Sequence, residues 1–440
     1  MFKRLLIANR GEIAVRIIRA CHELDIETVA VYSDVDEDSL HVKLADYACN
    51  IGPADATMSY LNGNAIIAAA QAAAVDAVHP GYGFLSENAD FADLVVNSGF
   101  TFVGPRSETI RKVGNKDAAR EAMQQAGLPM TRGSNPLTGP EEACRFAAEI
   151  TYPVILKPVS GGGGKSMFVA RNEQELLNAL SKVDIEHTAF YLEKYVANAR
   201  HIEIQIMADN YGNIIHLGER ECSLQRRNQK ILEEAPSSVL TADIRSRVGA
   251  LAVKAAKSVH YTNVGTVEFL MDKNSGHFYF MEINPRVQVE HGITEMITGV
   301  DIVRKQIRIA AGEPLNLTQK DISFTGHAIE CRINAEDPEF NFLPSPGQIT
   351  FYHQPGGPKV RVDSGVCAGS VIQPYYDSLM AKVIVHGRSR GEAIRVMRRA
   401  LHEFRVAGVK TTIGLQCRVL DDPNFCSGDI DTQFLRRMFA

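Results

Sequence analysis

The chain has 440 residues, of which 45% are hydrophobic and 22% charged, so we expect two to four packed subdomains of an ordinary globular protein. The net charge of −5, without a long basic run, gives no support for a nucleic-acid partner. The sequence also lacks an uncharged apolar stretch of about 18 residues and any CxxC pair, so we expect a cytoplasmic protein with no membrane span, disulfide frame or zinc site.

The first hundred residues alternate apolar strand patterns with amphipathic helix patterns. The strand candidates are Leu5–Ala8, Thr28–Tyr32, Ala77–His79 and Thr101–Val103, and helix patterns such as Ile13–Leu24 and Asn64–Ala74 lie between them. This alternation predicts a parallel sheet with helices on its faces. The turn at residues 9–12 lacks the full GxGxxG pattern, so a dinucleotide site is not expected there.

A glycine run marks a second unit that begins near Lys116. The β-like runs 152–158 and 167–170 flank Ser160–Ser166, which reads SGGGGKS. Glycines without a Cβ let backbone N–H groups approach an anion closely, and Lys157 adds positive charge. The next helix pattern begins only near Asn172, so this is not the GxxxxGK[ST] phosphate loop, and a structural hairpin turn remains the alternative.

A predicted hairpin farther along the chain carries two acids. The β-like runs 266–271 and 277–283 are joined by the turn signal DKNSG at 272–276, which places Glu268 opposite the neighbourhood of Glu282. Two carboxylates one cross-strand step apart repel each other unless a cation lies between them. Magnesium prefers carboxylate and phosphate oxygens, so the pair suits Mg-ATP, and a solvated hairpin is the alternative.

Polar residues alternate with apolar ones directly after this turn. Every even position from 282 to 290 is polar, whereas 281, 283, 287 and 289 are apolar, which predicts an extended segment with one functional edge and a bend at Pro285. Arg286 offers a fork of donors for a planar anion, and Glu290 can act as general base. The pattern therefore predicts an ATP-using enzyme that activates a small anionic acid, with bicarbonate as the favoured substrate.

A last region begins near His327. It contains the β-like runs 348–352 and 382–385 and a basic helix pattern over 392–404. We detect no internal repeat and no low-complexity tract.

Long strings in this order resemble the ATP-grasp superfamily, and specifically the biotin carboxylase family, from end to end. The strings are IANRGEI (7–13), HPGYGFLSENA (79–89), YLEKY (191–195), QRRNQKILEEAP (225–236), QVEH (288–291), ECRINAED (330–337) and FLPSPG (342–347). The resemblance implies an α/β and α+β protein of three domains. These are a Rossmann-like parallel-sheet domain (1–112), an ATP-grasp domain (113–326) with a mobile lid at about 131–196, and a mixed β C-terminal domain (327–440).

The resemblance also implies roles for individual residues. The phosphate contacts of ATP would be Lys116, Lys157 and the Gly163–Gly164 backbone. The adenine hinge would be Glu193, Lys194, Tyr195 and Val196, with His201 nearby on the nucleotide. The metal ligands would be Glu268, Glu282 and Asn284. The bicarbonate site would be Lys230, Arg286, Gln288, the Val289 backbone and Glu290, and Arg332 would steady the biotin enolate.

The implied reaction uses ATP, Mg²⁺ or Mn²⁺, and bicarbonate to form carboxyphosphate. Carboxyphosphate decomposes to CO₂ and phosphate, and the phosphate deprotonates biotin N1′, which attacks CO₂. No AMKM-type attachment lysine is present, so the biotin would be held by a separate biotin carboxyl carrier protein, beside a carboxyltransferase subunit. Acetyl-CoA carboxylase, which serves fatty acid synthesis, is the favoured complex, with propionyl-CoA, pyruvate or another acceptor as the alternatives.

Three departures from the family pattern favour weaker ATP binding or a stiffer lid. Asn228 stands where His is common, the glycine loop reads SGGGGKSM rather than GGGGGRGM, and Pro285 and Gly292 flank the QVEH string. None of the three removes a proposed catalytic group. Asn228 and the altered loop leave a non-catalytic nucleotide-binding paralogue open, and another ATP-grasp carboxylate–amine ligase, which would share the lysines with Glu268 and Glu282, is the alternative among enzymes.

A homodimer is expected from the first helix. Its residues Arg16, Arg19 and Glu23 alone predict a solvated polar face, but the equivalent charges of the family lie at a dimer contact.

Overall fold

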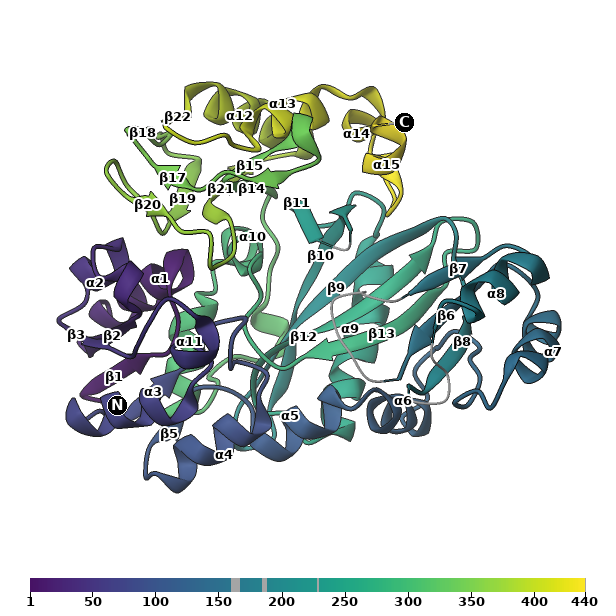
Figure 1. Cartoon of the computed structure of the whole chain (residues 1–440), viewed down its shortest axis with the longest axis horizontal. Helices are drawn as coiled ribbons and strands as arrows, with labels where there is room; N and C mark the ends of the chain where they lie inside the picture. The colour runs from purple at the N-terminus through teal and green to yellow at the C-terminus, as the bar shows by residue number, and fades with distance from the viewer. Residues whose placement is uncertain (160–166, 184–187, 228, 440) are drawn as a thin grey trace.

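A computed structural model describes residues 1–159, 167–183, 188–227 and 229–439 of the chain (Figure 1). The N-terminal part contains a five-stranded parallel sheet of order β3-β2-β1-β4-β5. Its strands are β1 (Arg4–Ile7), β2 (Glu27–Tyr32), β3 (Tyr47–Asn50), β4 (Ala77–His79) and β5 (Thr101–Phe102). The predicted strands are confirmed, and β3 was missed because its residues are mostly exposed and carry no apolar run.

Helices cover both faces of this sheet. They are α1 (Gly11–His22), α2 (Leu40–Leu44), α3 (Gly63–Ala72), α4 (Ala89–Asn97) and α5 (Ser107–Gly114). Asn62 and Asn88 cap α3 and α4 by accepting backbone N–H bonds, which explains where these two helices begin. The apolar face of α1 packs on β1 with Ile13 and Ile17, in a core that includes Leu5.

A small three-stranded antiparallel sheet forms a separate lobe, on the right of Figure 1. Its strands, in the order β7-β6-β8, are β6 (Val154–Pro158), β7 (Phe168–Ala170) and β8 (Phe190–Lys194), and its helices are α7 (Pro140–Ile150) and α8 (Glu173–Leu180). The helix α6 (Lys116–Gln125) leads into this lobe. Residues 160–166, 184–187 and 228 lie outside the described residues, so the predictions for Gly163, Gly164 and Asn228 rest on sequence alone.

An eight-stranded antiparallel sheet of order β13-β12-β9-β10-β11-β14-β21-β19 forms the centre of the molecule. Its strands are β9 (Ala199–Ala208), β10 (Ile214–Arg226), β11 (Gln229–Ala235), β12 (Asn263–Asp272), β13 (Phe278–Asn284), β14 (His327–Asn334), β19 (Val360–Ser364) and β21 (Leu379–Gly387). The helices α9 (Ala242–Ser258), α10 (His291–Thr298) and α11 (Ile302–Ala310) pack around it. The pairing of β11 with β14 carries the sheet from the middle of the chain into its C-terminal part.

The C-terminal part adds short strand pairs and a helical cover. These are β15 (Glu336–Asp337) with β16 (Leu343–Pro344), β17 (Gly347–Gln348) with β20 (Val371–Ile372), and β18 (Phe351–His353) with β22 (Arg405–Ala407). The helices are α12 (Arg390–Glu403), α13 (Ile413–Asp421), α14 (Pro423–Ser427) and α15 (Phe434–Met438). The predicted strand 348–352 is therefore wrong as one element, because the chain changes partner between β17 and β18.

The mixed α/β class, with a parallel N-terminal sheet and antiparallel sheets elsewhere, is confirmed. Within the described ranges, the longest and most apolar helices fall short of what a bilayer crossing requires.

Arg16 corrects the interpretation of the first helix. Its side chain is buried and pairs with Glu295 at 3.0 Å and Asp301 at 2.6 Å, so it is not part of a solvated face. Arg19 and Glu23 are exposed. The predicted helical spacing was correct, but Glu295 of α10 and Asp301 at the start of α11 bind Arg16 and bury it.

Candidate active site

The acid hairpin forms with the predicted register. Glu268 on β12 is the direct cross-strand partner of Glu282 on β13, and the ladder has an irregularity immediately after this pair. Asn284 closes β13, and its Nδ2 donates to Glu268 Oε1 at 2.9 Å. Glu268 is buried, whereas Glu282 is exposed to solvent. One acid of the pair is therefore enclosed by protein and the other is reached by water.

The two carboxylates have opposite electrostatic environments. Burial alone would raise the pKa of Glu268, but the charges of Lys230 and His201 outweigh it and hold that pKa below its usual value. Desolvation by the surrounding protein and the negative charge of Glu268 raise the pKa of Glu282. A divalent cation near Glu282 would relieve this repulsion.

Lys230, on β11, links three acids from three other segments. Its Nζ lies 3.0 Å from Glu268 and 2.6 Å from Glu290, and it also pairs with Glu203 of β9. Burial disfavours the charged ammonium, but these carboxylates raise the pKa of Lys230 well above its usual value. Lys230 therefore stays cationic at the point where the metal acids and Glu290 meet.

Arg332, on β14, holds the other side of Glu290. Its Nη2 lies 2.8 Å from Glu290 Oε2, and its Nε donates to Glu233 Oε1 at 2.7 Å. Burial would raise the pKa of Glu290, but Lys230 and Arg332 lower it well below its usual value. Glu290 is thus an ionised carboxylate between two cations.

The segment after β13 departs from the predicted extended edge. β13 ends at Asn284, the chain turns through Pro285, and Glu290 stands at the N-cap position of α10. Met281, predicted on the buried edge, is 40% exposed. The two-residue alternation fails first at Met281, which the bulge opposite Glu268 and Phe269 leaves without a partner, and again after Asn284, where the chain leaves the strand. The turn still brings Gln288 and Glu290 into the buried site.

Arg286 lies at the solvent side of this turn. Its Nη1 donates to Gln288 Oε1 at 2.7 Å, and its Nε lies 2.7 Å from Glu87 of the N-terminal part. Gln288 Nε2 in turn donates to Glu268 Oε1 at 3.2 Å. The guanidinium is therefore oriented by Gln288 and by Glu87 of the N-terminal part, and Gln288 links it to Glu268.

A second cluster of charges lies on the β6–β8 lobe. Lys157 Nζ on β6 donates to Glu193 Oε2 on β8 at 2.6 Å, and Arg120 of α6 also pairs with Glu193. Burial lowers the pKa of Lys116, which senses the charges of Glu282, Lys157 and Glu193. The two predicted phosphate lysines are thus electrostatically coupled to each other and to a metal acid.

The hinge residues follow at the end of β8. Lys194 Nζ donates to the carbonyls of Thr151 and Tyr152 at 2.9 and 3.0 Å. Tyr195 and Val196 are half-buried, and the Tyr195 hydroxyl accepts a bond from Gln433. Lys194 fixes the strand end by its side chain.

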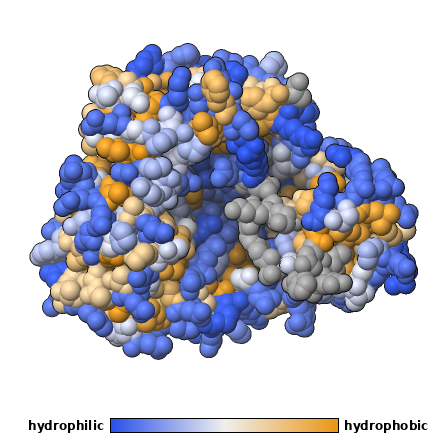
Figure 2. Space-filling model, in the orientation of Figure 1, coloured by the Kyte–Doolittle hydropathy of each residue, from blue (hydrophilic) through white to orange (hydrophobic). Residues whose placement is uncertain are grey.

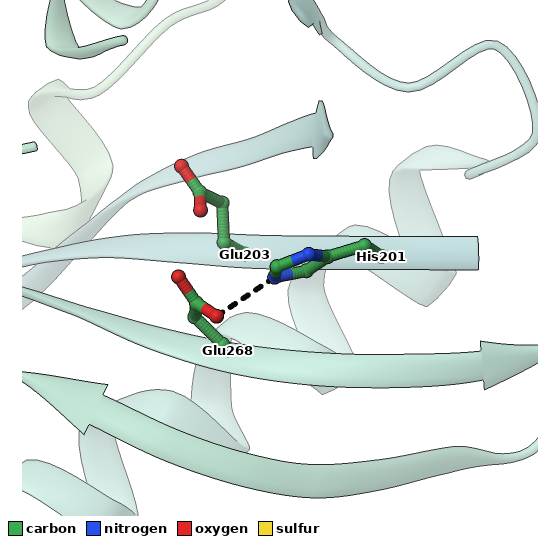
Figure 3. Close-up of side chains that lie close together, drawn as sticks. All are labelled: His201, Glu203 and Glu268. Atoms are coloured by element: carbon green, nitrogen blue, oxygen red, sulfur yellow. Dashed lines mark ion pairs between the residues drawn. The ribbon is translucent and has the colours of Figure 1, made fainter. Parts of the chain in front are cut away.

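His201 lies closer to the metal acids than the resemblance implied. Figure 3 shows His201 and Glu203 on one strand facing Glu268 on its neighbour, with His201 Nε2 2.8 Å from Glu268. These three groups could together hold an ion, but Lys230 already contacts both acids, and a divalent ion there would have to displace its ammonium. Oxygen ligands also suit Mg²⁺ better than imidazole, so the residues fit a metal at Glu268, Glu282 and Asn284 better.

Sequence reasoning missed several groups of this site, namely Arg120, Glu203, Arg220, Glu233 and Lys382. Glu203 had a detectable signal, because 201–206 alternates His, Glu and Gln with isoleucines in the same way as 281–290. Arg220 is fully buried and pairs with Glu203, which fixes that acid from β10. Glu233 lies in the quoted string 225–236, but nothing there set it apart from its neighbour Glu234. Arg120 is one of several charges on α6, and Lys382 is a single charge in an apolar strand, so neither had a local signal.

The site lies where the three parts of the chain meet. Figure 2 shows a hollow lined by hydrophilic residues at the centre of the face, between the N-terminal part, the C-terminal part and the β6–β8 lobe. Lysines on one lobe face a carboxylate hairpin on a long antiparallel sheet. This fold and this site define an ATP-grasp enzyme, an ATP-dependent ligase.

Family models match almost the whole chain. They are "Biotin carboxylase, N-terminal domain" over residues 1–110, "Carbamoyl-phosphate synthase L chain, ATP binding domain" over 115–318, and "Biotin carboxylase C-terminal domain" over 330–437. Biotin carboxylase 1 of Bacillus subtilis is 56% identical, over 99% of this chain and 98% of that protein. The chain belongs to the biotin carboxylase family.

Solved structures agree with this assignment. The biotin carboxylase domain dimer of Hydrogenobacter thermophilus 2-oxoglutarate carboxylase, in complex with MgADP, ADP and bicarbonate, superposes with a TM-score of 0.93 at 49% identity, covering 99% of this chain and 98% of that one. A biotin carboxylase–nucleotide complex from Campylobacter jejuni gives a TM-score of 0.95 at 44% identity, with 99% of each chain covered.

Proposed function

We propose that this chain carboxylates the biotin of a separate carrier protein, with ATP and bicarbonate as co-substrates. The observation that carries the proposal is the placement of Glu290 between Lys230 and Arg332, one contact away from the metal acid Glu268. A nucleotide-binding module without chemistry has no need for an ionised carboxylate held in this way.

ATP is held between the β6–β8 lobe and the central sheet. Lys116 and Lys157 bind its phosphate oxygens, together with the backbone of Gly163 and Gly164, and residues 193–196 hold the base. Glu268, Glu282 and Asn284 hold Mg²⁺ or Mn²⁺, which offsets negative charge on the phosphoryl group during transfer. The support for the lysines is their mutual coupling with Glu282.

Bicarbonate is held beside the terminal phosphate by Arg286, Gln288, the Val289 backbone and Lys230. Its oxygen attacks the γ-phosphoryl group while Glu290 accepts its proton, which yields carboxyphosphate and ADP. An anion bound at Lys230 competes with Glu290 for the positive charge that lowers the pKa of Glu290, so binding of bicarbonate makes this carboxylate a stronger base.

Carboxyphosphate then breaks into CO₂ and phosphate inside the closed site. The phosphate removes the proton from biotin N1′, the electron pair of N1′ attacks CO₂, and the negative charge on the ureido oxygen is stabilised by Arg332. The pairing of Arg332 with Glu233 and Glu290 supports this role, because the two acids hold the guanidinium in one position beside Glu290.

The proposal extends to partners and organisation. We assign domains 1–112, 113–326 with the lid at 131–196, and 327–440, supported by the limits of the three family models. A biotin carboxyl carrier protein and a carboxyltransferase subunit complete the enzyme, within an acetyl-CoA carboxylase or a carboxylase of another acceptor. A homodimer is supported by the dimer in the Hydrogenobacter structure.

The test is bicarbonate-dependent ADP formation that free biotin stimulates. A carboxylate–amine ligase would show no biotin effect, and a regulatory paralogue would show no turnover. Glu290→Gln should abolish turnover while Mg-ATP binding persists. The matched control is Glu219→Gln, which weakens another buried ion pair, that of Glu219 with Arg245, and it should keep turnover. Loss of Mg-ATP binding in Glu290→Gln would contradict the role of Glu290 as base.

A further inference from the structure

Lys382 of β21 is buried without solvent exposure inside an apolar strand, LMAKVIVHG. A charged side chain in such a place costs free energy unless it is paired and hydrogen-bonded. The Nζ of Lys382 meets this need with Glu12 of α1 at 3.2 Å and the main-chain carbonyl of Val289 at 2.6 Å. One ammonium thus joins the N-terminal helix, the C-terminal strand and the turn that carries Glu290.

The position of Lys382 on the sheet is the second observation. Lys382 is the direct cross-strand partner of Arg332, so the two side chains lie on the same face of the sheet. Arg332 binds the side chain of Glu290, while Lys382 binds the carbonyl of the residue before it. Two neighbouring cations therefore hold consecutive residues of one turn, one through the side chain and the other through the backbone.

The bond to the Val289 carbonyl constrains more than one atom. A peptide unit is planar, so fixing this carbonyl also fixes the N–H of Glu290 and the direction in which its Cα leaves the turn. The preceding carbonyl, of Gln288, accepts a bond from His291 Nδ1 at 2.8 Å. Both carbonyls before Glu290 are thus held by side chains, one from β21 and the other from the first residue of α10.

We propose that Lys382 is a positioning residue for bicarbonate activation. Its ammonium fixes the Val289 peptide and so sets the place of the Glu290 carboxylate and of the Val289 backbone, with Glu12 as its counter-ion. Glu12 is itself held by the Tyr82 hydroxyl, so the N-terminal domain contributes to the alignment of the bicarbonate site without touching the substrate. This inference rests on the proposed function, because it refines the same site.

The main variant is Lys382→Met, which keeps an unbranched apolar stem that ends one atom short of Nζ and removes the donor. The bond between an ammonium and a carbonyl is worth enough to predict a fall of about tenfold or more in kcat/KM for bicarbonate. The KM for ATP should stay within about threefold, because Lys382 touches none of the groups assigned to the nucleotide.

A second variant separates positioning from folding. Lys382→Met leaves Glu12 buried without its counter-ion, so the double variant Glu12→Gln/Lys382→Met should recover part of the lost thermal stability, since a neutral amide can still accept the hydrogen bond of the Tyr82 hydroxyl. The recovery is partial because Asp363 also lies 3.9 Å from the Lys382 ammonium. The recovered protein should keep the bicarbonate defect. Arg245→Met, which breaks a buried pair with Glu219 away from the turn, is the matched control and should lower the Tm without changing the KM for bicarbonate.

Two outcomes would overturn the inference. One is Lys382→Met with unchanged kcat/KM for bicarbonate, and the other is a double variant that regains normal bicarbonate kinetics with its stability. Failure of the proposed function is distinguishable, because it would already show in the wild-type chain as an absence of bicarbonate-dependent ADP formation.

Discussion

Replacing Glu233 with Gln should separate the two half-reactions, namely bicarbonate-dependent cleavage of ATP and carboxylation of biotin. Glu233 Oε1 accepts from Arg332 Nε at 2.7 Å and lies 2.6 Å from its Nη2, while Glu290 keeps a third contact at 2.8 Å. Gln keeps the accepting oxygen but removes the charge. The difference between a charged and a neutral hydrogen bond is about 1–2 kcal/mol, which corresponds to about five- to thirtyfold in rate.

This loss of rate should appear in the carboxylation of biotin and not in the cleavage of ATP. Arg332 is assigned to the ureido oxygen of biotin, and a less firmly aimed guanidinium lowers kcat/KM for biotin. Bicarbonate-dependent ADP formation without biotin should change by less than about threefold, since Lys230 still holds Glu290. Carboxybiotin is measured from labelled bicarbonate and ADP by a coupled assay. Burial raises the pKa of Glu233 to about 7 against the opposing charge of Arg332, so the assay is run at pH 8, where the wild-type carboxylate is ionised.

Glu234→Gln is the control for this change. Glu234 is the next residue on β11, and its buried carboxylate pairs with His327 at 2.8 Å and Arg390 at 2.7 Å. The variant makes the same chemical change on the opposite face of the strand, and it should affect stability without affecting the ratio of carboxybiotin to ADP. Equal losses of both half-reactions in Glu233→Gln would refute the reasoning.

Three further predictions concern the metal, the core and pH. Glu282→Gln should raise the Mg²⁺ concentration needed for half-maximal ADP formation at least several-fold, and an unchanged requirement would remove Glu282 from the metal ligands. Phe269→Ala, at a fully buried ring that packs edge-on against Phe278 and Phe280, should lower the unfolding free energy by about 3–5 kcal/mol in urea titrations; a loss below about 1 kcal/mol would contradict its core role. Burial lowers the pKa of His79 to about 3, so stability is lost as pH falls below about 6.5, where the unfolded chain binds the proton first. His79→Asn, which keeps an acceptor for the Gly81 N–H, should flatten this loss by up to about 1.4 kcal/mol per pH unit in Tm-derived stabilities, and an unchanged slope would show that His79 does not cause it.

Local patterns were sufficient for the elements and for the approximate placement of the acid pair. The two β-like runs and the turn signal between them predict the hairpin and place Glu268 near Glu282. The direct pairing of the two acids depends on the bulge between Glu268 and Phe269, which skips Met281 and which no local pattern predicted. The strand–helix alternation of the first hundred residues likewise fixed a parallel sheet. The family strings located the remaining site residues by resemblance rather than by any argument from spacing.

The sequence by itself predicted a hairpin with two neighbouring acids, followed by Arg286, Gln288 and Glu290, and its motifs resembled one family. Only the tertiary structure decided that Lys230, Glu290 and Arg332 meet, and that Lys382 stands behind them. Lys230, Arg332 and Lys382 come together because β11, β14 and β21 are neighbours in the sheet although they are far apart in the chain, and Glu290 meets them from the N-terminus of α10. Hydrophobic periodicity tells which side of a strand is buried, but it contains no information about which distant strand will lie beside it.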